Sequence, residues 1–244
     1  VIVSAVLVEH VGHLRATARC GGVRTPQRTR DTAFILKPLM VRPSAVLRTV
    51  YAIPFRYRCG YGVHSPFAFS LITDVIYEKM PYYAYSYFEK ETEKDDKRAW
   101  VTKGSQKVNR FLFRLVNRVQ PDTIIEVGRP SSTTLYLQSA KPSASYLLLP
   151  LVGTVSGADT SVDFLYLNDY QNPDLLEEVF RVCVHRTTLK SVFVVHGICY
   201  SKEMKVLWKK WQADERVGIT FDLYDVGLLF FDKTKIKQQY IVNF

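Results

Sequence analysis

The sequence predicts a doubly wound α/β fold, with a mostly parallel sheet of about seven strands, a helical segment before it and an antiparallel hairpin near the end. Two observations favour this class. From residue 105 onward, short apolar runs alternate with helical patterns, which is the order produced by parallel strands and their crossover helices. The last apolar stretches, GITFDLYDVGLLFF and QQYIVNF, are joined by the polar DKTKIK, as the strands of a hairpin would be.

The first predicted helix follows a serine–proline step. Ser65 is a suitable N-cap, and Pro66 suits the first turn of a helix. We expect its buried face to consist of apolar residues at helical spacing: Phe67, Phe69, Leu71, Ile72, Val75 and Ile76.

A tyrosine cluster and a histidine flank this helix. Tyr82, Tyr83, Tyr85 and Tyr87 could form an aromatic wall that faces a substrate, or a packed lid whose hydroxyl groups reach water. His64, just before the serine–proline step, could be a catalytic base or a structural residue of the turn.

An amphipathic helix is predicted directly before the first strand. It ends at Pro121, which cannot continue a helix. The following TIIEV, residues 123–127, is a short β-branched run that fits a buried parallel strand. The apolar residues at helical spacing are Val108, Phe111, Leu112, Leu115, Val116 and Val119.

The remaining elements repeat the alternation. TTLYLQSA, NPDLLEEVFRVCV and SKEMKVLWKKWQA read as helices, the second with Asn172 as N-cap and Pro173 in its first turn, and the third capped by Ser201. ASYLLLP, VDFLYLN and SVFVVHG read as the second, third and fourth strands.

Composition limits the class of protein. At 244 residues and 47% hydrophobic content, the chain can bury a sizeable core. No apolar run reaches the roughly 18 residues that span a bilayer, and the opening VIVSAVLVEH lacks the basic start of a signal peptide. We therefore expect a cytoplasmic protein without a membrane segment. The four cysteines are widely spaced and form no C-x-x-C pair, which predicts free thiols and argues against a zinc site.

The net charge of +10 is concentrated at the front of the sequence. Residues 1–50 hold eight Lys or Arg against two acidic residues, Glu9 and Asp31, a balance of +6. This stretch could be an arm that neutralises nucleic-acid phosphates, a solvated tail, or a segment foreign to the native chain. Because it lacks interleaved aromatic residues for base stacking, nucleic-acid binding is not the function we expect.

Changes in composition divide the sequence into three expected parts. Residues 1–44 form a basic extension without helical or strand periodicity, which we expect to be poorly ordered. Residues 45–100 are predicted to be a helical cap or lid, and residues 101–244 a Rossmann-like domain.

The candidate site follows from the fold. Doubly wound sheets bind ligands at the carboxyl ends of their strands, so a site should be assembled from the residues found there. These are Glu126 and Gly128 after the first strand, Leu149 and Pro150 after the second, Asn168 and Asp169 after the third, and His196 and Gly197 after the fourth.

Several stretches resemble a known family. The order of elements, with EVG at the first turn, VDFLYLND as the third strand and DLYDVGLLFF as a closing hairpin, is similar to the class I S-adenosylmethionine-dependent methyltransferases, especially the small O-methyltransferase-like group. The stretches GYGVHSPFAF, SKEMKVLW and QQYIVNF resemble a bacterial set of such proteins that carries an HSPF segment ahead of the fold. The resemblance implies S-adenosylmethionine as cofactor and methyl transfer to a small or medium-sized acceptor, whose identity the sequence does not indicate.

The resemblance also assigns cofactor-binding residues. In the family the first loop runs acidic-x-Gly-x-x-x-Gly, and here Glu126 and Gly128 keep the first part while Ser131 stands about where the second glycine belongs. Asn168 and Asp169 stand at the end of the third strand, where the metal-dependent members of the family carry a carboxylate. We take these five residues as the candidates for contact with the cofactor.

Other positions depart from the family pattern. SYLLLP offers no acidic residue for the ribose hydroxyls, and VVHGI lacks the carboxylate that a magnesium site would need, so we expect no metal. His196 is the best candidate for a base that would deprotonate a hydroxyl acceptor, although it could equally be a structural histidine at the sheet edge. Asp169 could face a ligand or begin a turn before Asn172.

Two functions therefore remain open. One is a methyltransferase whose lid selects the acceptor. The other is a methyltransferase-like fold that has lost catalysis and serves as a ligand-binding or protein-interaction module, which the altered first loop favours. A dehydrogenase is disfavoured, because G-x-G-x-x-G does not follow the first strand.

Overall fold

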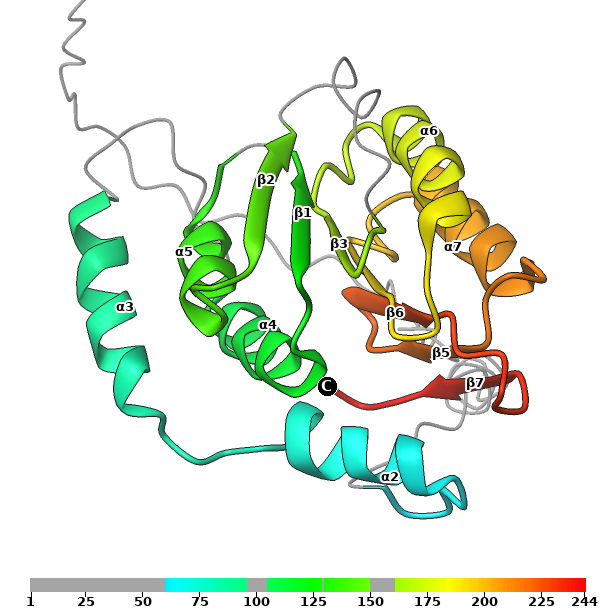
Figure 1. Cartoon of the computed structure of the whole chain (residues 1–244), viewed down its shortest axis with the longest axis horizontal. Coiled ribbons are helices and arrows are strands. Elements are labelled where there is room, and N and C mark those ends of the chain that lie inside the picture. The colour runs from blue at the N-terminus through cyan, green and yellow to red at the C-terminus, as the bar shows by residue number, and fades with distance from the viewer. Residues whose placement is uncertain (1–59, 96–104, 129, 150–160) are drawn as a thin grey trace, which may run out of the picture. The chain divides into compact units, whose positions relative to one another are not determined.

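The computed structural model describes residues 60–95, 105–128, 130–149 and 161–244, apart from the side chains of 91–95. Within these ranges the chain forms a seven-stranded sheet with helices on both faces (Figure 1). The predicted basic extension and Pro150 lie outside the described residues. The strands, in their order across the sheet, are β2 (Ser145–Leu149), β1 (Thr123–Val127), β3 (Phe164–Leu167), β4 (Val192–His196), β6 (Val226–Phe230), β5 (Ile219–Asp222) and β7 (Gln238–Ile241).

The helices precede, connect and cover these strands (Figure 1). They are α2 (Pro66–Leu71), the π-helix η1 (Ile72–Ile76), α3 (Tyr83–Asp95), α4 (Gln106–Val119), α5 (Ser132–Ala140), α6 (Pro173–Cys183), the short 3₁₀ turn η3 (Val184–Arg186) and α7 (Lys202–Ala213). Among the described residues, no helix combines the length and the apolar character needed to cross a membrane.

Strand direction confirms the predicted fold class. β1 is parallel to β2 and β3, and β3 is parallel to β4. β6 is antiparallel to both of its neighbours, β4 and β5, so the sheet is mostly parallel with one reversed strand. The direction of the four parallel strands places their carboxyl ends at one edge of the sheet.

The hairpin lies within the stretch that the family resemblance implied, and not across the polar DKTKIK as the apolar pattern had suggested. GITFDLYDVGLLFF forms both strands of the hairpin, β5 and β6. In the tight turn between them, Tyr224 has a φ of 78°, and the Tyr224 N–H donates to Asp222 Oδ1 at 2.9 Å. QQYI forms β7, which pairs with β5 in parallel. The apolar pattern predicted a single strand here because the turn residues Leu223 to Asp225 include neither Gly nor Pro, the usual markers of a break.

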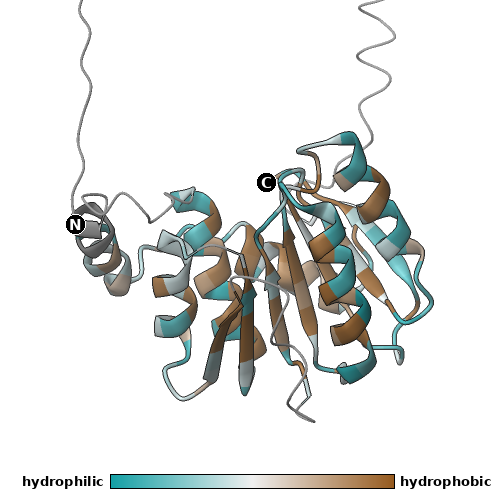
Figure 2. Cartoon of the chain, turned by 90° about the horizontal axis from the view of Figure 1, so that it is seen from above, coloured by the Kyte–Doolittle hydropathy of each residue, from teal (hydrophilic) through white to brown (hydrophobic). Residues whose placement is uncertain are grey.

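Two hydrophobic layers hold the sheet. One face packs against α2, η1, α4 and α5, and the other against α6 and α7. Figure 2 shows strands that are mostly hydrophobic between helices that carry both hydrophilic and hydrophobic sides. Along β1 the side chains alternate, so Ile124 and Glu126 point to the α4/α5 face while Ile125 and Val127 point to the α6/α7 face.

The helix predicted from the Ser65–Pro66 step begins as expected. Ser65 Oγ accepts a hydrogen bond from the Ala68 N–H at 3.4 Å, and Pro66 is the first helical residue. Phe69, predicted to be buried, is 46% exposed, because the buried stripe of this helix runs through Ala68 and Leu71 and Phe69 lies to one side of it.

Helix α4 also matches its prediction. Its predicted apolar residues are buried except Val119, which is half-buried, and Gln120 ends the helix in the left-handed conformation, with a φ of 54°, directly before Pro121. On α3, Phe88 contacts Phe113 of α4 and Tyr136 of α5, which attaches α3 to the domain.

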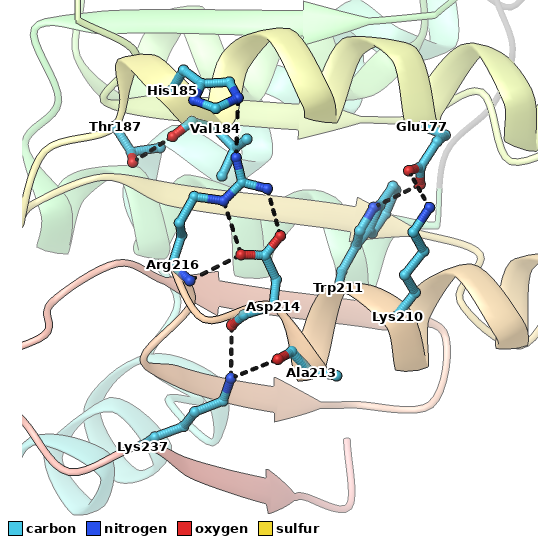
Figure 3. A network of polar contacts seen from close by, with 10 residues as sticks. All are labelled: Glu177, Val184, His185, Thr187, Lys210, Trp211, Ala213, Asp214, Arg216 and Lys237. Carbon is cyan, nitrogen blue, oxygen red and sulfur yellow. Dashed lines mark hydrogen bonds and ion pairs between the residues drawn. The ribbon is translucent and has the colours of Figure 1, made fainter.

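A polar network fixes the end of α7 and the approach to β7 (Figure 3). Arg216 donates from Nε and from its backbone N–H to Asp214 Oδ1, both at 2.9 Å, and its Nη1 lies 3.2 Å from His185 Nε2. Lys237 Nζ donates to the backbone carbonyls of Ala213 and Asp214 at 3.1 and 2.7 Å. These contacts connect η3, α7 and the strand that follows the hairpin.

Candidate functional site

The carboxyl ends of β1, β3 and β4 bring the predicted site residues to one edge of the sheet. The Asn168 N–H donates to the Val127 carbonyl at 2.9 Å, and the Gly128 N–H donates to the Leu149 carbonyl at 3.0 Å. His196 is the last residue of β4, the next strand along. Backbone pairing therefore continues past the strand ends and holds these positions beside one another.

Glu126 is a fully buried carboxylate with an uneven set of partners. Its Oε2 accepts hydrogen bonds from Thr134 Oγ1 at 2.9 Å and from the Tyr146 hydroxyl. Its Oε1 is buried and has no hydrogen-bond partner. Burial raises the pKa of Glu126 from 4.5 to about 7, against the smaller lowering effect of the bonds from Tyr146 and Thr134.

Gly128 lets the turn after β1 approach the turn after β3. Its φ is 128°, a region that other residues rarely adopt. A Cβ at this position would lie 3.3 Å from both the Asn168 carbonyl carbon and the Asp169 nitrogen. The glycine is thus required by the chain's own packing, whatever else the loop contacts.

Ser131 begins helix α5. Its hydroxyl accepts from the Thr133 N–H at 3.2 Å, while Thr134 Oγ1 accepts from the Ser131 N–H at 3.4 Å, which makes a capping box. Asn109 of α4 holds the same turn by donating to Ser132 Oγ at 3.0 Å and accepting from Thr133 Oγ1 at 2.7 Å. The residue in the place of the family's second glycine is therefore a helix cap.

His196 is oriented by Asn168. His196 Nδ1 and Asn168 Oδ1 lie 2.8 Å apart, and the Tyr166 hydroxyl donates to the same oxygen at 3.2 Å. Because the amide oxygen can only accept, Nδ1 carries the proton and Nε2 is the basic nitrogen of the neutral ring. Burial lowers the pKa of His196, opposed by the charge of Asp225, so the ring is held in the form that can accept a proton.

Aromatic rings surround this histidine. Tyr166 is roughly parallel to it with ring centroids 6.4 Å apart, and Tyr170 meets it edge to face at 5.3 Å. Tyr170 also contacts Tyr200 at 4.5 Å. A Cβ on Gly197 would lie 2.5 Å from the Tyr170 ring, so the tyrosine rests directly on the glycine.

Sequence reasoning missed these tyrosines. Tyr166 lies inside a buried strand, where an aromatic side chain ordinarily packs in the core. Tyr170 reaches His196 only because the turn after β3 folds back over the end of β4. The glycine directly after the last residue of β4, Gly197, was the available signal, since it marks a place where another group approaches closely.

Asp169 belongs to the turn that leads into α6. Its Oδ2 accepts from Asn172 Nδ2 at 2.7 Å, and its carbonyl accepts from the Asn172 N–H at 2.9 Å. Asn172 stands at the N-cap position of α6, as predicted, but makes no capping side-chain hydrogen bond because its amide is used here. This geometry favours the turn interpretation of Asp169.

The tyrosines before α4 divide into two groups. Tyr82 and Tyr85 line a cavity of about 620 Å³ between η1, α3 and α4, with Tyr85 buried and Tyr82 partly exposed, whereas Tyr83 and Tyr87 are exposed outside its lining. His64 is exposed in the turn before α2. Within the described ranges, no three His, Cys, Asp or Glu residues come together as a metal site would require.

No protein-family model and no curated protein sequence matches the chain. Solved structures that it resembles include the O-methyltransferase TomG from Streptomyces achromogenes in complex with S-adenosylmethionine, at 14% identity and a TM-score of 0.46, covering 62% of this chain and 91% of TomG. The Podospora anserina methyltransferase PaMTH1, bound to S-adenosylhomocysteine, is 10% identical with a TM-score of 0.45, covering 78% of this chain and 96% of PaMTH1.

A third similar structure is the Bacillus cereus O-methyltransferase in complex with S-adenosylhomocysteine. It is 13% identical with a TM-score of 0.41, and the match covers 66% of this chain and 96% of that one. At these TM-scores the matches do not support a conclusion about function. Such a conclusion has to rest on the strand order and the geometry of the site.

Proposed function

We propose that the chain is an S-adenosylmethionine-dependent methyltransferase that acts on a small acceptor, with its cofactor site at the carboxyl end of β1. The observation that carries the proposal is the buried Oε1 of Glu126, which has no partner. A buried acceptor without a donor costs roughly 1–3 kcal/mol, more when charged, so such an atom is expected to be satisfied by a ligand.

The charge of the cofactor suits this position. S-adenosylmethionine carries a sulfonium and an ammonium group, and a carboxylate in a buried environment would supply the counter-charge. Glu126 would hold the cofactor together with the backbone of Gly128. When bound, the cofactor supplies the methyl group on its sulfonium sulfur.

Residues at the end of β3 and β4 would deprotonate and surround the acceptor. His196 is neutral, its Nδ1 proton is directed to Asn168, and its Nε2 is available to accept a proton from a hydroxyl group. The rings of Tyr166 and Tyr170 flank the histidine and would limit the access of water.

A second candidate is a ligand-binding module without methyl transfer. Ser131 is used as the cap of α5, Glu126 Oε2 is bonded by Thr134 and Tyr146, and Leu149 at the end of β2 is apolar. Each of these features stabilises the chain itself at a place where the resemblance implies cofactor contacts.

Titration calorimetry of the full chain with S-adenosylmethionine and S-adenosylhomocysteine separates these candidates. We expect micromolar binding that Glu126→Gln weakens by about tenfold or more, because one charge-assisted interaction is lost. Glu215→Gln, at an exposed glutamate after α7, is the matched control and should leave the affinity unchanged. No detectable heat at millimolar ligand, from protein shown to be folded, would contradict the proposal and favour the second candidate.

Proton release gives a readout that is independent of activity. Since the pKa of Glu126 is about 7, a cation bound beside it should lower that pKa and release part of a proton near neutral pH. The binding heat should therefore depend on the ionisation heat of the buffer, and this dependence should disappear in Glu126→Gln. For the transfer step, His196→Gln should keep the affinity for the cofactor and lose methyl transfer to acceptors that carry a hydroxyl group.

A further inference from the structure

The cavity between η1, α3 and α4 is separate from the site at the strand ends. Its volume is about 620 Å³, within the range of small-molecule sites. Its lining includes none of the five predicted cofactor residues and not His196, although it does include Tyr82 and Tyr85 of the tyrosine cluster. It therefore needs an explanation of its own.

Arg114 is the unusual residue of this cavity. It lies on α4, is only 8% exposed, and bonds neutral groups: Nε donates to the Val75 carbonyl at 2.7 Å, Nη2 to the Ile76 carbonyl at 3.5 Å, and Nη1 to the Tyr85 hydroxyl at 3.4 Å. Among the ion pairs of the described residues, none involves Arg114. A buried guanidinium without a carboxylate is costly, so an anion would stabilise it.

The guanidinium also has donors to spare. Of its five N–H groups, the three bonds to η1 and α3 use one each, which leaves two for a ligand. The carbonyls that orient it are those at the end of the π-helix η1, a local geometry that is frequent at functional sites. Arg114 is thus held in place without being neutralised.

The other cations of the lining strengthen the positive potential. Arg110 is paired with Glu89 and stacks over the Tyr85 ring at 5.0 Å, and Lys107 lies 4.1 Å from the centre of the Phe244 ring. With Lys79 and Arg114 the lining carries four positive charges, against the two negative charges of Glu78 and Glu89, a balance of +2.

Aromatic surface completes the site. Tyr82, Tyr85 and Phe244 line the cavity, and the rings of Tyr82 and Tyr85 lie 5.3 Å apart. Such rings offer apolar faces to a planar organic ligand. We propose that this cavity binds a small aromatic carboxylate, with its anionic group on Arg114 and its ring against these aromatic side chains.

Binding of benzoate to the full chain tests the proposal, with benzamide as the neutral analogue of the same shape. Benzoate should bind at least about tenfold more tightly than benzamide, because its charge meets a buried guanidinium. Arg114→Met should abolish this preference, whereas Arg118→Met, one turn further along α4 and exposed, should leave it unchanged.

A second variant covers the case in which Arg114→Met fails to fold. Ser86 lines the cavity from the exposed side of α3, so Ser86→Trp should fill the space while all charges stay in place. Benzoate affinity should fall at least about tenfold in this variant, as the ring would occupy the ligand's volume. Equal affinity for benzoate and benzamide, no binding of benzoate at millimolar concentration, or full affinity in Ser86→Trp would overturn the proposal.

The two sites can be tested apart. Glu126→Gln should leave benzoate binding intact, because Glu126 is not part of the cavity lining. Loss of benzoate binding in this variant would mean that the anion does not bind in the cavity, and would also overturn the proposal. Benzoate binding in a chain that fails to bind S-adenosylmethionine would leave this proposal standing while the methyltransferase proposal falls.

Discussion

The two oxygens of the buried Glu126 carboxylate differ in their hydrogen bonds. Oε2 accepts from two donors, whereas Oε1 accepts from none. The donors come from Thr134 on α5, eight residues further along the chain, and from Tyr146 on β2, twenty residues further along. The position in the strand could be predicted from sequence, but these contacts could not, because strand pairing and helix placement create them.

The raised pKa of Glu126 makes stability depend on pH. Its pKa is about 7 in the folded chain against 4.5 in the unfolded chain, so its contribution is fully present below about pH 4.5 and is lost as the pH rises through 7. The shift of about 2.5 units corresponds to roughly 3 kcal/mol. We expect Glu126→Gln to remove this pH dependence. Between pH 5 and 8, the free energy of unfolding of the variant should therefore rise relative to that of the wild type by up to about 3 kcal/mol.

Urea denaturation at several pH values measures this difference. The midpoints of wild type and Glu126→Gln should diverge as the pH rises, with unchanged slopes. Parallel midpoints over the same range would show that the carboxylate is already satisfied in the folded protein. That result would also remove the observation on which the proposed cofactor site rests.

Gly197 tests the contact between Tyr170 and the end of β4. Gly197 has a φ of 72°, and a Cβ there would meet the Tyr170 ring at 2.5 Å. Gly197→Ala should lower the free energy of unfolding by about 2–4 kcal/mol, from backbone strain together with the clash. Gly62 has nearly the same φ, 77°, but is exposed, so Gly62→Ala should cost only about 1 kcal/mol. Equal losses in urea denaturation would show that Tyr170 moves away freely.

At the level of elements, helix starts are the features that sequence predicted best. Ser65 and Ser201 were assigned as caps, and both accept a backbone hydrogen bond in the first turn of the helix that follows. These are local interactions over three residues, and local spacing is visible in a sequence. Asn172 shows the limit, because its side chain bonds Asp169 instead of capping α6.

The two N-cap serines of α7 and α4 provide a matched comparison. Ser201 Oγ accepts from the Met204 N–H at 3.1 Å, whereas Ser105 makes no capping side-chain bond. Ser201→Ala should therefore reduce stability by about 1 kcal/mol, and Ser105→Ala by only a few tenths. Thermal and urea denaturation of both variants measures this difference. A loss at Ser105 as large as at Ser201 would mean that the hydrogen bond at α7 is not the cause.

At the level of the whole molecule, the alternation of strands and helices predicted the sheet and its mostly parallel character. The placement of β6 between β4 and β5, and of β7 beside β5, could not be predicted. Which strands pair depends on how their side chains pack in the folded sheet, and the order of the strands along the chain does not show this. The candidate site shows the same division. Glu126, Gly128, Asn168, Asp169 and His196 were predicted at the strand ends, whereas their tyrosine partners depend on tertiary contacts.

The reversed strand β6 depends on a close fit between Gly227 and Trp208 of α7. Gly227 pairs with Val195 on one side and Asp222 on the other, and a Cβ there would lie 2.5 Å from the Trp208 ring. Trp208 is held by a bond from its Nε1 to Asp222 Oδ2 at 3.3 Å, so the indole cannot retreat without losing that bond. Gly227→Ala should cost about 2 kcal/mol.

A double-mutant cycle tests whether this fit keeps β6 in the centre of the sheet. Trp208→Leu alone should cost about 3 kcal/mol by leaving a cavity. In Gly227→Ala/Trp208→Leu the new methyl group has room, so the combined loss should be smaller than the sum of the single losses by at least about 1 kcal/mol. Additive losses in urea denaturation would show that Gly227 is required for another reason. Since Gly227 lies one residue along β6 from the partner of His196, a change in packing here would also displace the end of β4 that carries the candidate base.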